Sequence, residues 1–250
     1  MSSTPAFPRQ DARTIADDGD TLNFCSTCAF SQACMSEGMN KADLMDLHML
    51  VEHVGPLHAG AHVFRAGDTF EAIAAVRSGT VKTYTVERDG HEHVLGFYFP
   101  GEVIGLDGIH GDRYPCNAVA LDTVMLCRFS FPKISVLATQ LPGLQQHLFR
   151  LLSRDIGRAA LLAGDWTADQ RMAGFLVGLS RRLAARGFSP DRFQLTMART
   201  DIANYLRLAP ETVSRVLRRF QEAGLVRLDR REVELLRRDE LDALAEPLQR

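Results

Sequence analysis

Three of the chain's five cysteines lie within ten residues of one another, in the sequence Cys25-Ser-Thr-Cys28-Ala-Phe-Ser-Gln-Ala-Cys34. This C-x2-C-x5-C spacing allows three thiolates to converge on one soft metal centre. A 4Fe–4S cluster or a structural zinc ion takes about four ligands, so a fourth must come from elsewhere in the chain. The remaining cysteines are Cys116 and Cys127.

Charge is divided unevenly along the chain. The 250 residues carry a formal net charge of −2. The segment from Arg171 to Arg231, however, contains thirteen arginines against five acids, a net charge of +8. A basic segment joined to an acidic remainder is typical of a protein in which one part meets a polyanion such as nucleic acid. Charge alone is also compatible with an arginine-rich surface that is merely solvated.

The composition is that of a soluble globular protein, with 46% hydrophobic and 24% charged residues. Residues 1–24 contain no apolar run and are predicted to be a disordered tail. We find no signal peptide and no apolar stretch of the roughly 20 residues that a membrane span needs, so a cytoplasmic location is expected. Clustered cysteines there indicate metal or redox chemistry. No P-loop, GxSxG or HExxH motif is present, so an enzyme is not expected.

The apolar pattern predicts a short helix over residues 39–54, followed by β-structure from Gly55 to about Phe131. In that second stretch, short apolar runs are separated by glycines about eleven residues apart, at Gly67, Gly79, Gly90 and Gly101. Many short antiparallel strands in a sandwich, barrel or roll would give this pattern. Asp89-Gly90 between two such runs predicts a hairpin turn.

A long helix is predicted from about Pro142 to Gly164. Apolar residues recur along it at spacings of three and four, at Leu141, Leu144, Leu148, Leu152, Ile156, Ala159 and Ala163. This repeat is typical of a dimer interface, although a core helix packing only on its own chain remains an alternative. Thr167-Ala-Asp-Gln170 is a capping-box pattern that begins a further helix, which Gly187 ends.

Residues 199–223 predict a helix-turn-helix: a helix over Thr200–Leu206, a turn over 207–209 and a second helix from Pro210. Four apolar residues of the second helix are predicted to point inward, namely Val213, Val216, Leu217 and Phe220. Six polar residues are left facing outward: Glu211, Thr212, Ser214, Arg215, Arg218 and Arg219. The segments Leu225-Val-Arg-Leu and Val233-Glu-Leu-Leu then predict a β-hairpin wing.

The outward residues suit contacts with double-stranded DNA. Arg215 can donate to guanine O6 and N7, Glu211 can accept from cytosine N4, and Ser214 is an adaptable polar contact. Arg218 and Arg219 lie further along the helix and are expected to meet phosphates. A helical hairpin that binds no nucleic acid is the alternative.

The order of these parts resembles the Crp/Fnr family of bacterial transcription regulators, and within it the oxygen-sensing Fnr branch. The motifs that carry the resemblance are the cysteine spacing at 25–34, Leu179-Ser-Arg-Arg-Leu, Gly187-Phe-Ser-Pro190 and Glu211-x-x-Ser214-Arg215. The resemblance implies an α+β fold. It consists of an N-terminal double-stranded β-helix (a jelly-roll-like β-roll) sensor domain, a long dimerisation helix and a C-terminal winged helix-turn-helix. We expect a flexible arm at 1–38, the β-roll at 39–138, the dimerisation helix at 139–166 and the DNA-binding domain at 167–250.

In the branch that the chain resembles, four cysteines hold an oxygen-labile 4Fe–4S cluster, and the fourth comes from the β-roll. Val124-Met-Leu-Cys127 matches the context of that cysteine, at the end of an apolar strand. Cys116, in Arg113-Tyr-Pro-Cys-Asn, does not match it and is expected to be a small, partly buried thiol. The predicted iron ligands are therefore Cys25, Cys28, Cys34 and Cys127.

The resemblance further implies an oxygen-responsive global regulator and activator that controls genes of anaerobic metabolism. With its cluster intact, it would bind inverted repeats of TTGAT-like half-sites as a homodimer and contact RNA polymerase through the loop Glu87–His91. Cyclic nucleotide is not expected, because the stretch from Gly101 to Asn117 lacks the family's Arg-Ser/Thr pair and offers only Asp107 near the expected acid. Family members often carry an acidic residue near Ala159 whose repulsion keeps the apo protein monomeric; this chain lacks it there, so the apo form is expected to dimerise more readily. The alternative is a regulator of the same fold switched by zinc or by a thiol–disulfide reaction.

Overall fold

The computed structural model describes residues 46–246, apart from the side chains of residues 160–163. The predicted ligands Cys25, Cys28 and Cys34 lie outside this range. The chain divides into two compact units, one up to residue 154 and one from residue 155 onward, with residues 92–94 assigned to the second. The boundary falls within the long helix.

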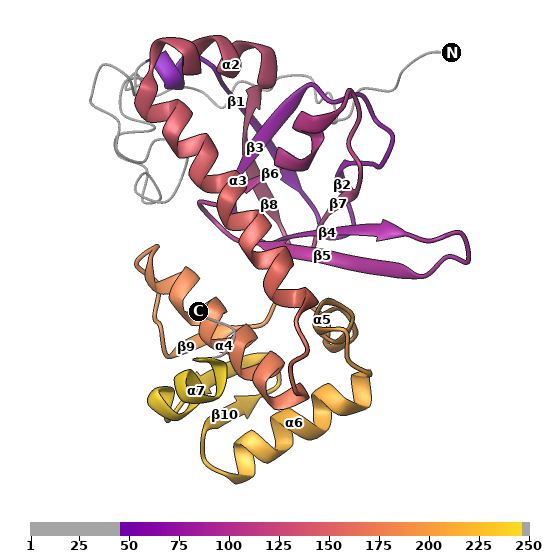
Figure 1. The fold of residues 1–250 in the computed structure, drawn as a ribbon, viewed down its shortest axis with the longest axis vertical. Coiled ribbons are helices and arrows are strands. Elements are labelled where there is room, and N and C mark those ends of the chain that lie inside the picture. Colours follow the sequence, from indigo (N-terminus) through magenta and orange to yellow (C-terminus); the bar gives the residue numbers. More distant parts are fainter. Residues whose placement is uncertain (1–45, 247–250) are drawn as a thin grey trace. The chain divides into compact units, whose positions relative to one another are not determined.

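The first unit is built on two four-stranded sheets (Figure 1). One sheet has the order β1-β8-β3-β6, formed by Val51–Leu57, Val124–Ser130, Ala72–Ser78 and Val103–Ile104. The other has the order β2-β7-β4-β5, formed by His62–Phe64, Asn117–Ala120, Val81–Val86 and Glu92–Tyr98. Neighbouring strands of the first sheet pair antiparallel, although they are far apart in sequence. This confirms the predicted β-roll.

Two helices accompany the first sheet: α2 (Phe131–Gln140) and α3 (Pro142–Ala163). Helix α3 begins at the predicted proline, whereas α2 was not predicted. It follows β8 directly, with Pro132 in its first turn, where the missing N–H costs nothing. Its buried residues are Ile134, Leu137 and Ala138.

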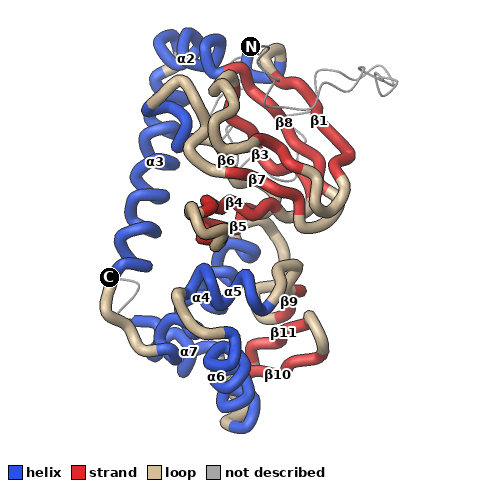
Figure 2. The backbone as a smooth tube through the Cα atoms, turned by 90° about the vertical axis from the view of Figure 1, so that its right-hand side faces the viewer, coloured by secondary structure: helices blue, strands red, loops and turns tan. Residues whose placement is uncertain are grey.

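Strand β3 shows how the layers are organised, because its residues alternate between two apolar clusters. Ala72, Ala74 and Val76 belong to the cluster between the two sheets. Ile73 and Ala75 belong to the cluster on the opposite face, with buried residues of α2 and α3. A strand places successive side chains on opposite faces, so this sheet is covered on both. Figure 2 shows α2 and α3 beside it.

One predicted element is wrong in its extent. The helix expected over 39–54 is seen only at 46–48 in the described part of the chain, and β1 begins at Val51. Residues 51–54 pair with 126–129 of β8, and this long-range pairing overrides the local helical spacing of the apolar residues.

The second unit contains α4 (Ala168–Ala184), α5 (Arg199–Leu206), α6 (Pro210–Glu222) and α7 (Arg238–Ala245). The predicted capping box opens α4, since the Gln170 N–H donates to Thr167 Oγ1 (3.3 Å) and the Thr167 N–H donates to Gln170 Oε1 (3.0 Å). The predicted wing is present as β10 and β11, Val226–Asp229 and Glu232–Leu235. A short strand that was not predicted, β9 (Arg192–Gln194), pairs with β11.

Candidate DNA-binding surface and candidate cluster ligand

Helix α6 has one buried face and one exposed face. Its buried residues are the four predicted to point inward: Val213, Val216, Leu217 and Phe220. Five of the six predicted outward residues are exposed and Thr212 is partly buried; the exposed ones are Glu211, Ser214, Arg215, Arg218 and Arg219. The helix can therefore present polar side chains to a ligand while its apolar face packs on α4 and α5.

The turn between α5 and α6 fixes where this helix begins. Arg207 ends α5 in the left-handed region (φ 54°, ψ 46°). Ala209 is the N-cap of α6 and Pro210 its first residue, so three residues connect the helices, as predicted. A short turn of this kind brings the N-terminal part of the second helix to the surface, where a helix-turn-helix reads the major groove.

The polar side chains of α6 differ in their partners. Arg215 Nη2 donates to Thr212 Oγ1 (3.1 Å), and Ser214 Oγ donates to the Pro210 carbonyl (3.1 Å). Arg218 and Arg219 instead form ion pairs, the first with Glu222 (3.1 Å) and the second with Asp169 of α4. Exposed ion pairs are worth less than about 1 kcal/mol, so phosphates can displace these carboxylates. Asp169 was not anticipated, because the contact joins residues fifty positions apart.

Cys127 lies in the middle of β8, between β1 and β3. Its strand partners are His53 on one side and Ala75 on the other. The side chain is partly exposed and packs against the cluster that contains α2 and α3, not against the core between the sheets. The thiol is therefore on the outer face of the first sheet, where a second segment can reach it.

His53 is a strand partner of Cys127, and its Nδ1 lies 3.8 Å from Cys127 Sγ. Burial lowers the pKa of His53, and the neighbouring charges of Arg77 and His48 lower it further, so the neutral form of the ring is favoured. The sequence does not predict that His53 lies opposite Cys127, because this pairing depends on the register of β1 against β8.

Cys116 occupies a different environment. It is 1% exposed and belongs to the cluster between the two sheets. Its Sγ–H donates to Asp107 Oδ2 (3.0 Å), and burial together with the Asp107 charge raises the pKa of the thiol. A metal ligand must be a thiolate, so Cys127 fits the donor set of a cluster better than Cys116 does.

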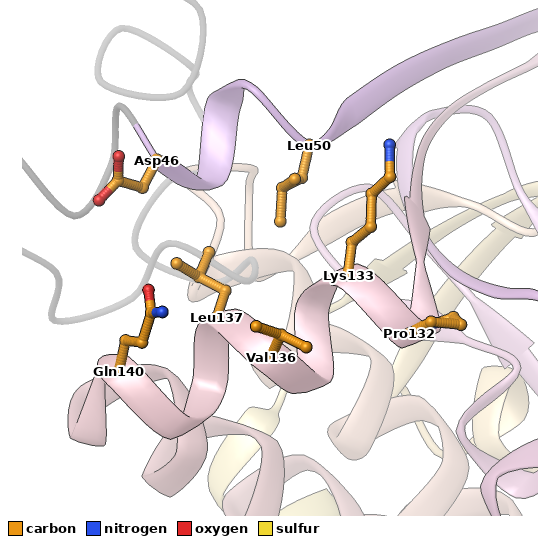
Figure 3. A pocket seen from close by; sticks show the side chains of 7 residues that line it. All are labelled: Asp46, Leu50, Pro132, Lys133, Val136, Leu137 and Gln140. Atoms are coloured by element: carbon orange, nitrogen blue, oxygen red, sulfur yellow. The ribbon is translucent and has the colours of Figure 1, made fainter.

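A groove lies beside the outer layer, between the segment that leads into β1 and helix α2 (Figure 3). It has a volume of about 530 Å³ and is lined by Asp46, Leu50, Pro132, Lys133, Val136, Leu137 and Gln140. Leu50 and Leu137 belong to the same apolar layer as Cys127. The groove is thus open and largely apolar, and it adjoins the apolar layer to which Cys127 also belongs.

Within residues 46–246, no three His, Cys, Asp or Glu side chains are grouped so as to hold a metal ion. A cluster would therefore need ligands from outside this range. None of the helices described is long and apolar enough to cross a membrane.

Comparison with known families matches both units. Residues 55–140 match the cyclic nucleotide-binding domain family, and residues 170–244 match the Crp-like helix-turn-helix domain family. The chain is 43% identical to the transcriptional activator protein Anr of Pseudomonas aeruginosa, over 88% of this chain and 92% of that protein. It is 39% identical to the fumarate and nitrate reduction regulatory protein of Escherichia coli, over 93% of this chain and 94% of that protein.

The chain belongs to the Crp/Fnr family. Among solved structures it is similar to FixK2 from Bradyrhizobium japonicum, with a TM-score of 0.70 and 26% identity over 78% of this chain and 96% of that one. Crp/Fnr proteins are transcription regulators, not enzymes; they bind DNA through the helix-turn-helix and act as dimers. The exposed face of α6 is therefore the candidate DNA-binding face of this Crp/Fnr regulator.

Proposed function

We propose that this regulator responds to oxygen through a 4Fe–4S cluster held by Cys25, Cys28, Cys34 and Cys127, and that it controls genes of anaerobic metabolism in the cytoplasm. The observation that carries the proposal is the position of Cys127, a partly exposed thiol on the outer face of the sheet. The names of relatives that concern fumarate and nitrate reduction support it.

The three arm cysteines are within reach of Cys127. The twelve residues from Cys34 to Asp46 span at most about 40 Å when extended. The next seven residues lead to His53, which is the strand partner of Cys127. The chain itself therefore allows the arm to fold back over the outer layer of the sheet, beside the groove of Figure 3.

A bound cluster would supply an oxygen-reactive group, and its shared coordination would link the arm to the β-roll. The residues of the chain determine what that link can affect. Cys127 packs against the apolar layer to which α3 contributes Leu144 and Leu151. A change at the thiol thus acts on a layer shared with the proposed dimerisation helix.

Helix α3 carries an exposed apolar face suited to a second copy of the chain. Phe149 is 60% exposed and Ile156 is 70% exposed, and they are seven residues apart, on the same side of the helix. Asp155 and Arg158 form an ion pair (3.6 Å), so the Asp155 charge is offset near the proposed seam. We expect the apo protein to dimerise more readily for this reason and because Ala159 carries no charge.

On DNA, Glu211, Ser214 and Arg215 would read each half of an inverted repeat with TTGAT-like half-sites. The loop Glu87–His91 is exposed and is held as a tight turn, with the His91 N–H donating to Asp89 Oδ1 (3.1 Å). This turn is the surface that we expect RNA polymerase to contact.

Cyclic nucleotide is not the proposed ligand, because the stretch from Gly101 to Asn117 lacks the family's Arg-Ser/Thr pair, and the core between the sheets includes the aromatic side chains of Phe64 and Tyr114. Tyr114 is 1% exposed, stacks on Phe64 with ring centroids 4.0 Å apart and donates its hydroxyl hydrogen to the Ala72 carbonyl. Burial raises the pKa of Tyr114 to about 12, so the group stays neutral. Neither Tyr114 nor Cys116 carries a positive charge that could balance the phosphate of a cyclic nucleotide.

The test compares Cys127→Ser with Cys116→Ser in protein purified without oxygen. The first variant is expected to lose iron, sulfide and visible absorption, since oxygen is a poor ligand for a soft iron centre. The second is expected to keep all three. Full iron content in Cys127→Ser, or its loss only in Cys116→Ser, would overturn the assignment.

The same preparations test the alternative of a zinc site or a thiol–disulfide switch. Stoichiometric zinc with no visible absorption would favour the zinc site. A colourless protein in which oxidants form a disulfide among the arm cysteines would favour the thiol switch.

A further inference from the structure

Two residues of the described chain have a backbone conformation that normally belongs to glycine. Nine glycines have positive φ, and the only other described residues that do are Arg207 (φ 54°) and Arg230 (φ 51°). This left-handed region is uncommon for residues with a Cβ, which comes close to a carbonyl oxygen there. Glycine would adopt it freely. Both exceptions are arginines, and both lie in the DNA-binding unit.

Arg207 stands next to the recognition helix. It closes α5, with its N–H donating to the carbonyls of Ala203 and Asn204. Helix α6 begins three residues later at Pro210, so the two Cα atoms are at most about 11 Å apart. The major groove that admits such a helix is about 12 Å wide and is bordered by phosphates. An arginine side chain at this distance from the helix start is long enough to reach the border of the groove.

Arg230 occupies the tip of the wing. It is the first of the two residues that connect β10 to β11. The connection joins Asp229 and Glu232, which are the last paired residues of the two strands. A turn of this length is usually supplied by Asn-Gly or similar residues that tolerate positive φ. Here it is Arg230-Arg231, which places two positive charges at the end of an exposed hairpin.

Ion pairing within the protein does not explain why these two positions are arginine. Many arginines of this unit are ion-paired, in the pairs Arg181–Asp242, Arg192–Glu232, Arg218–Glu222, Arg227–Glu234 and Arg237–Glu240. In the part of the chain that the structure describes, neither Arg207 nor Arg230 has a carboxylate partner. Their charges are available to an external anion.

We propose that Arg207 and Arg230 bind phosphates of the DNA backbone, and that this contact is why arginine is present where the backbone favours glycine. The proposal rests on DNA binding through the helix-turn-helix and is independent of the cluster. It assigns no base to either residue, because phosphate contacts position a protein and carry no direct sequence information.

Three substitutions at position 207 separate charge from backbone conformation in the full-length protein. Arg207→Gly removes both the charge and the strain, Arg207→Gln removes only the charge, and Arg207→Lys keeps the charge. We expect Arg207→Gly and Arg207→Gln to bind a fluorescent duplex about eightfold less tightly per protomer at 0.1 M salt, with a salt slope smaller by about one per protomer. Arg207→Lys keeps most of the affinity.

Thermal unfolding supplies the second measurement. Arg207→Gly is expected to melt at the same temperature as the wild type or higher, because glycine removes the strain of a Cβ in the left-handed region. Arg207→Gln keeps the Cβ and is not stabilised. Arg230→Gly is expected to follow Arg207→Gly in both measurements. The matched control is Arg181→Gln, which removes the same charge from a residue paired with Asp242 and should leave the salt slope unchanged.

The measurements are made on an inverted-repeat duplex with TTGAT-like half-sites and on an unrelated duplex of equal length. A phosphate contact weakens binding to both and leaves their ratio unchanged. If the wild type does not prefer the inverted repeat, the target sequence given under the proposed function is wrong. The phosphate contacts of Arg207 and Arg230 are still tested by both duplexes. Unchanged affinity and salt slope in Arg207→Gly and Arg207→Gln, or a lowered melting temperature in Arg207→Gly, would overturn the assignment.

Discussion

The two units hold their functional residues in different ways. In the DNA-binding unit these residues lie on one helix and the turn before it, and their side chains are exposed while the opposite face of α6 is buried. In the β-roll the candidate ligand Cys127 is a single thiol on a central strand, and the next residue back, Leu126, is fully buried. The DNA-reading site can therefore change without disturbing its fold, whereas the ligand site is part of the packing of the sheet.

The largest effects are expected from the cores that support each site. Leu144→Ala in α3 and Leu217→Ala in α6 each remove a buried side chain and should lower the free energy of unfolding by about 2–5 kcal/mol. Hydrogen exchange followed by residue should show faster exchange mainly in the unit that carries the substitution. If either change speeds exchange equally in both, the units unfold as one and the comparison fails.

The next effect concerns the difference between reading bases and binding phosphates. Arg215→Ala should cost about 1–3 kcal/mol of binding to the preferred site and relax the preference at one base pair. Arg218→Ala should weaken binding to all sequences alike. Titrations against duplexes with single base-pair changes measure both. A uniform loss in Arg215→Ala would remove Arg215 from the set of base-reading residues.

A smaller effect tests the local signals in the DNA-binding unit. Thr167→Ala removes the capping box of α4 and should lower the free energy of unfolding by about 0.5–2 kcal/mol. Thr139→Ala in α2 is the matched control, since Thr139 Oγ1 only donates to the Val136 carbonyl (2.7 Å) within an exposed turn. Denaturant unfolding of both variants should therefore differ. Equal stability would contradict the role of the cap.

The smallest effect depends on pH. The hydrogen bond from Arg192 lowers the pKa of Glu232, with the Arg192 charge acting in the same direction. Because the folded-state pKa lies below the unfolded one, this stabilisation is present above the unfolded value of about 4.3 and is lost as pH falls through the lower folded value. The stability difference between the wild type and Glu232→Gln should shrink between neutral pH and about pH 3. A difference that grows on acidification would contradict this sign.

Local signals in the sequence predicted the DNA-binding unit well. The capping box at Thr167, the turn before Pro210 and the apolar spacing from Val213 to Phe220 each act over a few residues, so a linear sequence contains them. The sequence did not predict the contacts between segments that are far apart along the chain. The ion pair of Arg219 with Asp169 and the pairing of β9 with β11 depend on tertiary packing.

The β-roll was predictable as a class but not in its details. The glycines at 67, 79, 90 and 101 all have positive φ, which explains why they separate the strands. The register that places His53 opposite Cys127 was not predictable, because pairing between strands so far apart follows from the whole sheet. The same long-range pairing turned residues 51–54 into a strand where a helix was expected.

The most direct test of the central proposal is DNA binding by one anaerobic preparation of the full-length protein, before and after air. Iron, sulfide and visible absorption are measured on the same sample. We expect about four irons per protomer, an absorption band that disappears in air, and a loss of specific DNA binding in step with it. A colourless, iron-free protein that binds its inverted repeat equally well in air would contradict the account.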